Sequence, residues 1–322
     1  MAKAGTKAKQ GAYSATQHGA VVCQEVWSRA SAETTLEVRT IAGETLFSHK
    51  LPEASVGHQI SQDGTLAYVL TGSEISEAGL LRRLIAIDLA NNTTRMVAVT
   101  TSALPAVDAL HVAYVTKTAL VVERHGGERI FEKSVGPLGV LHGGAAHACA
   151  LLPNNRVVLS RGHRGGEKIV DLTVFNIADG SEQSAIELPA ETFHATFAPA
   201  ALRADPQGEL VAILGFFAGL LIVDLATGKD VAADYAPDPL DLADGRSTRH
   251  AHHTYSDLAF DADGERLAAA YSPGKLSVWA RGGDVLKREW ICTNTKARRI
   301  VTFGTAEVAF FDSTGAAARF SL

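Results

Sequence analysis

A short hairpin pattern recurs along most of this chain, and it constrains the fold more strongly than any other feature. One copy is LAFDADGERLAAAY (258–271), in which a turn with Asp and Gly separates two apolar segments. An apolar segment, a turn rich in Asp, Asn or Gly, and a β-branched or aromatic segment are together typical of a β-hairpin. Similar segments occur at QISQDGTLAYVL (59–70), ALLPNNRVVLS (150–160) and ALRADPQGELVAIL (201–214), with weaker copies at 16–26, 107–115 and 302–311.

A second series of turns follows the first along the chain. Behind each hairpin comes another strand-like segment and another turn, as in LIAIDLANNTTRMV, LTVFNIADGSEQS and LIVDLATGKDV. The first series has its turns near residues 19, 64, 109, 154, 207, 263 and 304. Their spacing, roughly 40 to 56 residues, is the period of four-stranded propeller blades. The two series therefore predict an all-β fold: a single seven-bladed β-propeller of four-stranded antiparallel blades over residues 11–322.

The ends of several third segments resemble a known repeat. AIDLANN, VFNIADG, IVDLATG and SVWARGG lie where WD40 repeats carry Trp-Asp at the end of the third strand. On these segments the chain resembles the WD40 and YVTN-like bacterial β-propellers over residues 11–322. It departs from the WD40 pattern because Trp279 has no following Asp, and Asp88 and Asp224 have no Trp before them.

The resemblance also has an implication for the first and last strands of the chain. The last unit, from RRIVTFG (298–304) to AARFSL (317–322), supplies only three strands. The resemblance implies that an N-terminal strand within residues 10–18 completes this unit and closes the ring. Residues 1–10, MAKAGTKAKQ, are expected to form a flexible lysine-rich tail, and the absence of an apolar segment behind the lysines does not match a secretory signal.

Composition narrows the class of partner and the compartment. The formal net charge is −5 and the sequence pI is about 6.2, which gives no support for nucleic acid or an anionic membrane as the main partner. No apolar run approaches the length that spans a bilayer. The cysteines, Cys23, Cys149 and Cys292, are far apart and show no metal-binding spacing, so buried free thiols and a cytoplasmic location are expected.

The histidines gather at one end of the expected ring. In propellers of this family, the connections from strand four to the next blade and from strand two to strand three share one end, here called the top face. This placement puts eight of the 12 histidines there. His58, His147 and His194 fit the position of a structural histidine in WD40 repeats. The eight are His58, His142, His147, His163, His194, His250, His252 and His253.

A long irregular segment, residues 234–253, ends in HAHH and is a candidate metal site. Alternate residues of an extended chain point to the same side, so His250 and His252 can share one ion, while His253 faces away. Imidazoles together with a carboxylate would suit zinc. The other interpretation of this segment is a solvated or partner-facing loop, in which Asp238 and Asp241 are exposed.

Charged residues of the expected top face are the candidates for binding a partner. Two basic groups lie in SRGHRGGEK and TKARR, and further charges lie in the 234–253 segment. Such charges would recognise an acidic partner or keep the rim of the ring solvated. The candidate partner-binding residues are Arg161, Arg164, Lys168, Asp238, Asp241, Arg246, Arg249 and Arg298.

No motif in the sequence indicates catalysis. There is no GxSxG, no HExxH and no GxxxxGK phosphate loop. The leading prediction is therefore a non-enzymatic protein-interaction scaffold that uses no cofactor, with another protein as partner and no specific role for nucleic acid or membrane. The alternative is a lactonase-like hydrolase or small-ligand site at His147, Arg161 and His194, because GTLAYVLTG resembles repeats of cytoplasmic sugar-lactone hydrolases. A metal-binding role for His250 and His252 is the third possibility.

Overall fold

The computed structural model describes most of the chain and contains strands but no helix in the part that it describes. The described residues are 10–18, 21–28, 33–40, 44–52, 55–61, 64–76, 79–100, 104–135, 147–162, 170–188, 199–215, 219–234, 255–271, 275–282, 285–292, 297–303, 307–312 and 317–321.

The strands fall into consecutive groups along the sequence. The first half contains β1 (Gln10–His18), β2 (Val21–Ser28), β3 (Glu33–Thr40), β4 (Thr45–Lys50), β5 (Ser55–Ile60), β6 (Leu66–Ser76), β7 (Gly79–Asp88), β8 (Thr93–Thr100), β9 (Ala106–Val107), β10 (His111–Val115), β11 (Ala119–Arg124), β12 (Arg129–Ser134), β13 (His147–Leu152) and β14 (Arg156–Gly162). The second half contains β15 (Val170–Asn176), β16 (Glu182–Leu188), β17 (Pro199–Ala204), β18 (Leu210–Gly215), β19 (Gly219–Asp224), β20 (Asp230–Asp234), β21 (Tyr255–Phe260), β22 (Arg266–Tyr271), β23 (Lys275–Gly282), β24 (Val285–Cys292), β25 (Ala297–Phe303), β26 (Glu307–Asp312) and β27 (Ala317–Ser321).

Each group forms one antiparallel sheet in which strands that are neighbours in sequence are also neighbours in space. Six sheets have four strands, and the last, β25–β27, has three among the described residues. The all-β prediction and both turn series are confirmed, because every expected turn that falls between two described strands joins an antiparallel pair. β6 ends at Ser76 and β7 begins at Gly79, and the two strands pair from Ser76↔Gly79 onward.

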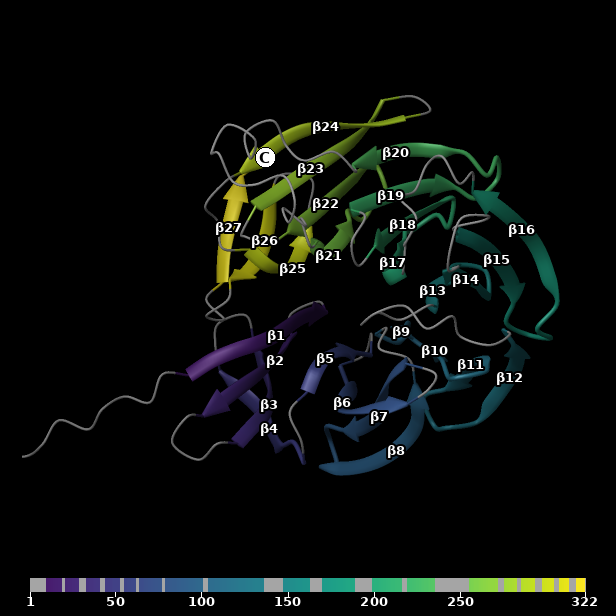
Figure 1. Ribbon diagram of the computed structural model, residues 1–322. Coiled ribbons are helices and arrows are strands. Elements are labelled where there is room, and N and C mark those ends of the chain that lie inside the picture. Colours follow the sequence, from purple (N-terminus) through teal and green to yellow (C-terminus); the bar gives the residue numbers. More distant parts are fainter. Residues whose placement is uncertain are drawn as a thin grey trace, which may run out of the picture.

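The first strands of successive sheets lie next to one another around a common centre (Figure 1). β1 contacts both β5 of the following sheet and β25 of the last one. Figure 1 shows the other strands of each sheet following outward from these first strands. β1, the first strand of the first sheet, is thus beside β25, the first strand of the last sheet.

The structure corrects one expectation about the N-terminal strand. β1 does not complete the last sheet; it pairs with β2, from His18↔Val21 to Gln10↔Ser28. Only two residues separate β1 from β2, so this hairpin closes a very short loop. Pairing with β27 would close a loop of nearly the whole chain, which costs more conformational entropy.

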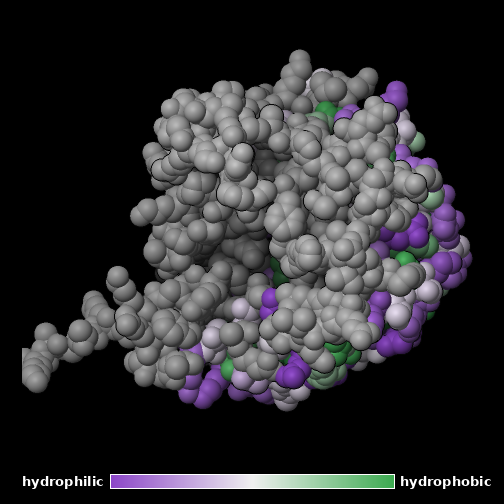
Figure 2. All heavy atoms as spheres, viewed as in Figure 1, coloured by the Kyte–Doolittle hydropathy of each residue, from purple (hydrophilic) through white to green (hydrophobic). Residues whose placement is uncertain are grey.

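Apolar side chains between adjacent sheets form the core. Val158 and Leu172 of the β13–β16 sheet pack with Val211, Ile213 and Leu221 of the β17–β20 sheet, and each is at most 1% exposed. Burying an aliphatic side chain of this size contributes about 1.5–3 kcal/mol. The middle strands of a sheet are covered on both faces, which is why their sequences are continuous apolar runs. Outside, hydrophilic residues predominate over β12 and β16 (Figure 2).

Candidate functional site

The two ends of the sheets differ in how the strands are connected. At one end, short turns join the first strand to the second and the third to the fourth, for example residues 153–155 and 225–229. At the other end, the top face, the fourth strand leads to the next sheet through residues 135–146, 189–198 and 235–254. The strand ends that these three longer connections join therefore lie at one end of the sheets, and the tight turns lie at the other.

The side chains of the tight turns are occupied by the backbone of their own turn. Oδ1 of Asp205, at the end of β17, accepts hydrogen bonds from the N–H groups of Glu209 and Leu210, both at 2.8 Å. Oδ1 of Asp261 accepts from the N–H of Arg266 at 3.1 Å, the same place one sheet later. These carboxylates shape turns.

The WD40-like positions at the end of the third strand have the same role. Oδ1 of Asp224 accepts from the N–H groups of Ala226 and Thr227, both at 2.8 Å. Oδ1 of Asp88 accepts from the N–H of Asn91 at 2.9 Å, and the hydrogen bonds from the Asn91 side chain and backbone lower the pKa of Asp88. These acidic residues therefore support turn geometry.

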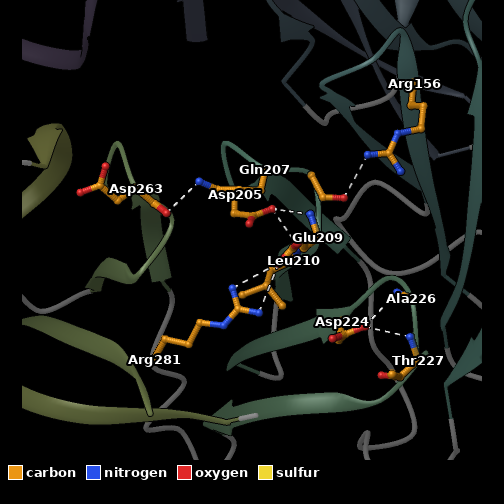
Figure 3. A network of polar contacts seen from close by, with 11 residues as sticks. Arg156, Asp205, Gln207, Glu209, Leu210, Asp224, Ala226, Thr227, Asp263 and Arg281 are labelled. Carbon is orange, nitrogen blue, oxygen red and sulfur yellow. Dashed lines mark hydrogen bonds and ion pairs between the residues drawn. The ribbon is translucent and has the colours of Figure 1, made fainter. Parts of the chain in front are cut away.

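Polar contacts link successive sheets at the end with the tight turns (Figure 3). A guanidinium nitrogen of Arg156 donates to the carbonyl oxygen of Gly208 at 3.2 Å, and Nε2 of Gln207 donates to the carbonyl oxygen of Asp263 at 2.8 Å. The guanidinium of Arg281 donates to the Glu209 carboxylate at 3.3 Å. This end is a network that fixes sheets relative to one another.

The structure brings together two residues of the predicted ligand site. His147 begins β13 and Arg161 lies near the end of β14, where the two are direct partners in the ladder. A guanidinium nitrogen of Arg161 donates to Oγ1 of Thr173 at 3.0 Å, and His147 is only 3% exposed. Both residues lie at the top-face end of their sheet, and the third, His194, lies outside the described residues.

Most of the predicted partner-binding residues lie outside the described residues. These are Arg164, Lys168, Asp238, Asp241, Arg246 and Arg249, together with the candidate metal ligands His250 and His252. Arg298 belongs to β25, but its side chain is outside the described part. Elsewhere, within the ranges described above, no group of three or more His, Cys, Asp or Glu side chains is arranged to hold a metal ion.

Several of the described histidines make structural contacts. His58 lies within β5 and is 1% exposed, which agrees with a structural position. His125, on a tight turn, contacts the Tyr68 hydroxyl through Nδ1 at 3.0 Å and the carbonyl oxygen of Asp108 through Nε2 at 3.0 Å. Nδ1 of His111 lies 3.2 Å from Oδ2 of Asp108.

Sequence reasoning missed the polar pairs that lie between strands. The hydroxyl of Tyr114 donates to Oε1 of the buried Glu123 at 2.9 Å, and burial, with Glu123 nearby, raises the pKa of Tyr114 above its usual range. Arg203 of β17 pairs with Asp257 of β21 at 3.5 Å, across two sheets. The only signal in the sequence is a charged residue inside an apolar strand, which does not identify its partner.

The described part of the chain contains no helix long and apolar enough to cross a membrane. No protein-family model matches the chain, and no curated protein matches its sequence. Solved structures do match its fold. Hsv2 of Kluyveromyces lactis matches with a TM-score of 0.59 and 12% identity over 97% of this chain and 93% of that one.

Two other solved structures agree with this match. A Kluyveromyces lactis Hsv2 variant with loop 6CD replaced by a Gly-Ser linker has a TM-score of 0.61 and 10% identity, over 97% of this chain and 93% of that one. A chain of the mitotic checkpoint complex has a TM-score of 0.61 and 12% identity, over 96% of this chain and 88% of that one. At these identities the likeness concerns the fold alone. The fold of this chain is that of the β-propellers.

Proposed function

We propose that this chain is a non-enzymatic scaffold that binds another protein through its top face. The observation that supports this proposal is the difference in length between the connections at the two ends of the sheets. Tight turns and cross-sheet contacts hold one end, whereas residues 135–146, 189–198 and 235–254 connect sheets at the other. Variable loops on a rigid scaffold are the usual place for recognition.

Charged residues of the connection 235–254 and of residues 163–169 supply the chemistry of recognition. Arg164 and Lys168 lie between β14 and β15, and Asp238, Asp241, Arg246 and Arg249 lie between β20 and β21. Arg298, near the start of β25, belongs to the same proposed surface. Arginine and carboxylate side chains exposed on loops suit a partner that carries complementary charges.

Affinity purification from the native organism tests the scaffold. We expect a stoichiometric partner to co-purify with the wild-type chain and to be lost when residues 238–248 are deleted or when Arg164→Glu and Lys168→Glu are combined. The melting temperature should change by less than about 2 °C, since both changes lie outside the strands of the described residues. Lys229→Glu, an exposed change on a tight turn of the opposite end, is the matched control and should retain the partner. A partner retained by both top-face variants would contradict the proposal.

A lactonase-like or small-ligand site is the second candidate, favoured by the ladder pairing of His147 with Arg161. His194 would complete this site from the connection 189–198. Lactone hydrolysis by the purified wild-type chain, abolished by His147→Ala or His194→Ala, would support it. An inactive wild-type chain across a panel of sugar lactones would exclude hydrolysis of that class.

We also infer that residues 11–322 form one domain, a closed ring of seven blades, behind a lysine-rich tail. The contacts of β1 with both β5 and β25 support closure of the ring. A compact domain of about this length has a radius of gyration of about 20 Å, which small-angle scattering measures. We place the protein in the cytoplasm, because its three cysteines are far apart in sequence and Cys149 is a buried free thiol.

A further inference from the structure

The turn after β17 contains a carboxyl group that uses only one of its two oxygens. Asp205 is 1% exposed, and its Oδ1 accepts hydrogen bonds from the N–H groups of Glu209 and Leu210. Its Oδ2 is buried and has no hydrogen-bond partner among the described residues. Burying such an oxygen costs more free energy in a charged carboxylate than in a neutral carboxyl group. A proton on Oδ2 would remove this cost.

The shape of the turn does not require a charge at this position. Ser61 holds the equivalent place in the β5–β6 turn, where its Oγ accepts a hydrogen bond from the N–H of Leu66 at 2.9 Å. The backbone bonds agree as well, because the N–H of Ser61 donates to Leu66 and the N–H of Asp205 donates to Leu210. A neutral oxygen therefore shapes the same turn, and Asp205 can be neutral and keep the bonds to its Oδ1.

The side chain of Gln207 brings a second acceptor to the same place. Its Nε2 donates to the carbonyl oxygen of Asp263 at 2.8 Å (Figure 3). Because a carbonyl oxygen only accepts, this contact fixes the orientation of the amide and leaves its Oε1 to accept. A Cβ on the buried Gly264 would meet Oε1 of Gln207 and would lie 3.3 Å from Oδ2 of Asp205. The two oxygens thus lie against the same glycine of the next sheet.

Charged groups from several elements surround this turn. They are Glu209 of the same turn, Arg156 of the β13–β14 turn, Asp261, Asp263 and Glu265 of the β21–β22 turn, Arg266 of β22 and Arg281 of β23. The guanidinium of Arg281 is bonded to Glu209, and that of Arg156 is bonded to backbone carbonyl oxygens. Burial is the largest cause that raises the pKa of Asp205, and Glu209 adds to it, whereas the N–H groups of the turn lower it.

We propose that Asp205 is a proton-dependent latch between the β17–β20 sheet and the β21–β24 sheet. When the carboxyl group is protonated, Oδ2 donates a hydrogen bond to Oε1 of Gln207, whose Nε2 holds the carbonyl oxygen of Asp263. As the pH rises, the proton leaves for solvent, and two acceptor oxygens then face each other beside Gly264. The amide of Gln207 turns away, and the link to the next sheet weakens. Residues 235–254 connect the same two sheets, so the latch lies in the joint that this connection spans.

Other contacts across this joint do not depend on the proton. Arg281 of β23 is bonded to Glu209 at 3.3 Å, and Arg203 of β17 pairs with Asp257 of β21 at 3.5 Å. Buried apolar side chains of both sheets, such as Leu210, form a common core. Opening of the latch therefore loosens the turn end of the joint and leaves the two sheets packed.

NMR of the labelled full chain tests the latch. From about pH 4 to pH 8, the Nε2 resonance of Gln207 should shift in one transition, with the same midpoint as the carboxyl carbon of Asp205. In Asp205→Asn, the new amide donates to Oε1 at every pH, so the Gln207 resonance should stay constant. Asp261→Asn is the matched control, because Asp261 accepts from the N–H of Arg266 at the same place one sheet later, and it should keep the wild-type transition.

Urea denaturation supplies a second measurement. Gln207→Ala should lower the midpoint at pH 4 at least about twofold more than at pH 7 in the wild-type background, and equally at both pH values in D205N. A Gln207 resonance that ignores pH in the wild type, or that shifts equally in D205N, would overturn the latch. Should D205N fail to fold, the loss caused by Q207A in the wild-type background decides, and an equal loss at pH 4 and pH 7 contradicts the proposal.

Discussion

Nε2 of Gln207 donates a hydrogen bond of 2.8 Å to the carbonyl oxygen of Asp263, which lies in the next sheet along the chain. The bond joins the β17–β18 turn to the β21–β22 turn, and Arg156 makes the equivalent contact to Gly208 one sheet earlier. Turns of the first series are thus linked from sheet to sheet. Their side chains and glycines should matter more for stability than surface turns usually do.

Gly208→Ala should destabilise the fold by about 1–3 kcal/mol. Gly208 has a φ of +70°, and a Cβ there would lie 2.7 Å from side-chain atoms of Pro153 and Arg156. Both backbone strain and the clash with the preceding sheet oppose the change. Urea denaturation measures it, and Gly126→Ala, with nothing within 4 Å of the new Cβ, is the control expected to stay within about 0.5 kcal/mol.

The free energy of unfolding should depend on pH through the carboxyl group of Asp205, and Asp205→Asn should remove this part of the dependence. Burial raises the pKa of Asp205, so protonation favours the folded state and stability falls as the pH rises through that raised pKa. The asparagine keeps an oxygen for the N–H groups of Glu209 and Leu210 without the buried charge. Denaturation at pH 4 and pH 7 should therefore show that the wild type loses more stability than D205N over this interval.

Asp179 should change the pH dependence of stability in the direction opposite to that of Asp205. Hydrogen bonds from Ser181 lower the pKa of Asp179, so its contribution is present above the usual pKa of an aspartate and is lost as the pH falls. Asp179→Asn should thus lose stability relative to the wild type at pH 7 and less at pH 3. If D179N and D205N altered the pH dependence of the free energy of unfolding in the same direction, the opposite pKa shifts given for these two aspartates would be contradicted.

Tyr114→Phe should cost about 1–3 kcal/mol at neutral pH, because Glu123 keeps its buried carboxylate and loses the hydroxyl donor. The pKa of Tyr114 is raised by burial, so its contribution is full below the unfolded value of 10.0 and is lost as the pH rises above it. Denaturation between pH 7 and pH 11 should show this loss in the wild type. Y114F should lose less stability than the wild type over this pH range. If the free energy of unfolding fell equally with pH in both proteins, Tyr114 would not be the cause of the loss.

Cys149 should resist alkylation in the folded protein. It is 4% exposed, and burial raises the pKa of its thiol to about 12, so almost no thiolate exists at neutral pH. Peptide mapping after iodoacetamide treatment should find residue 149 unmodified in native protein and modified in urea. Rapid labelling of the native chain at this residue would show that its sheet opens.

The repeating turns were predictable because their chemistry is local. Asp205 and Asp224 accept hydrogen bonds from N–H groups within five residues of themselves, so the sequence around each turn contains both partners. Apolar segments on either side then specify antiparallel strands. The top-face pairing of His147 with Arg161 is likewise a consequence of one hairpin. By contrast, the position of β1 was predicted wrongly from a family resemblance, although the short turn after residue 18 already favoured pairing with β2.

The sequence by itself determined the strands, the turns between them and the order of strands within each sheet, since these depend on residues close together in the chain. The tertiary structure alone decided which polar residues meet across sheets, such as Arg203 with Asp257 and Gln207 with Asp263. It also decided that Met96 and Val99 remain at the surface. Contacts between sheets join residues some fifty positions apart, and only the packing of whole sheets selects them.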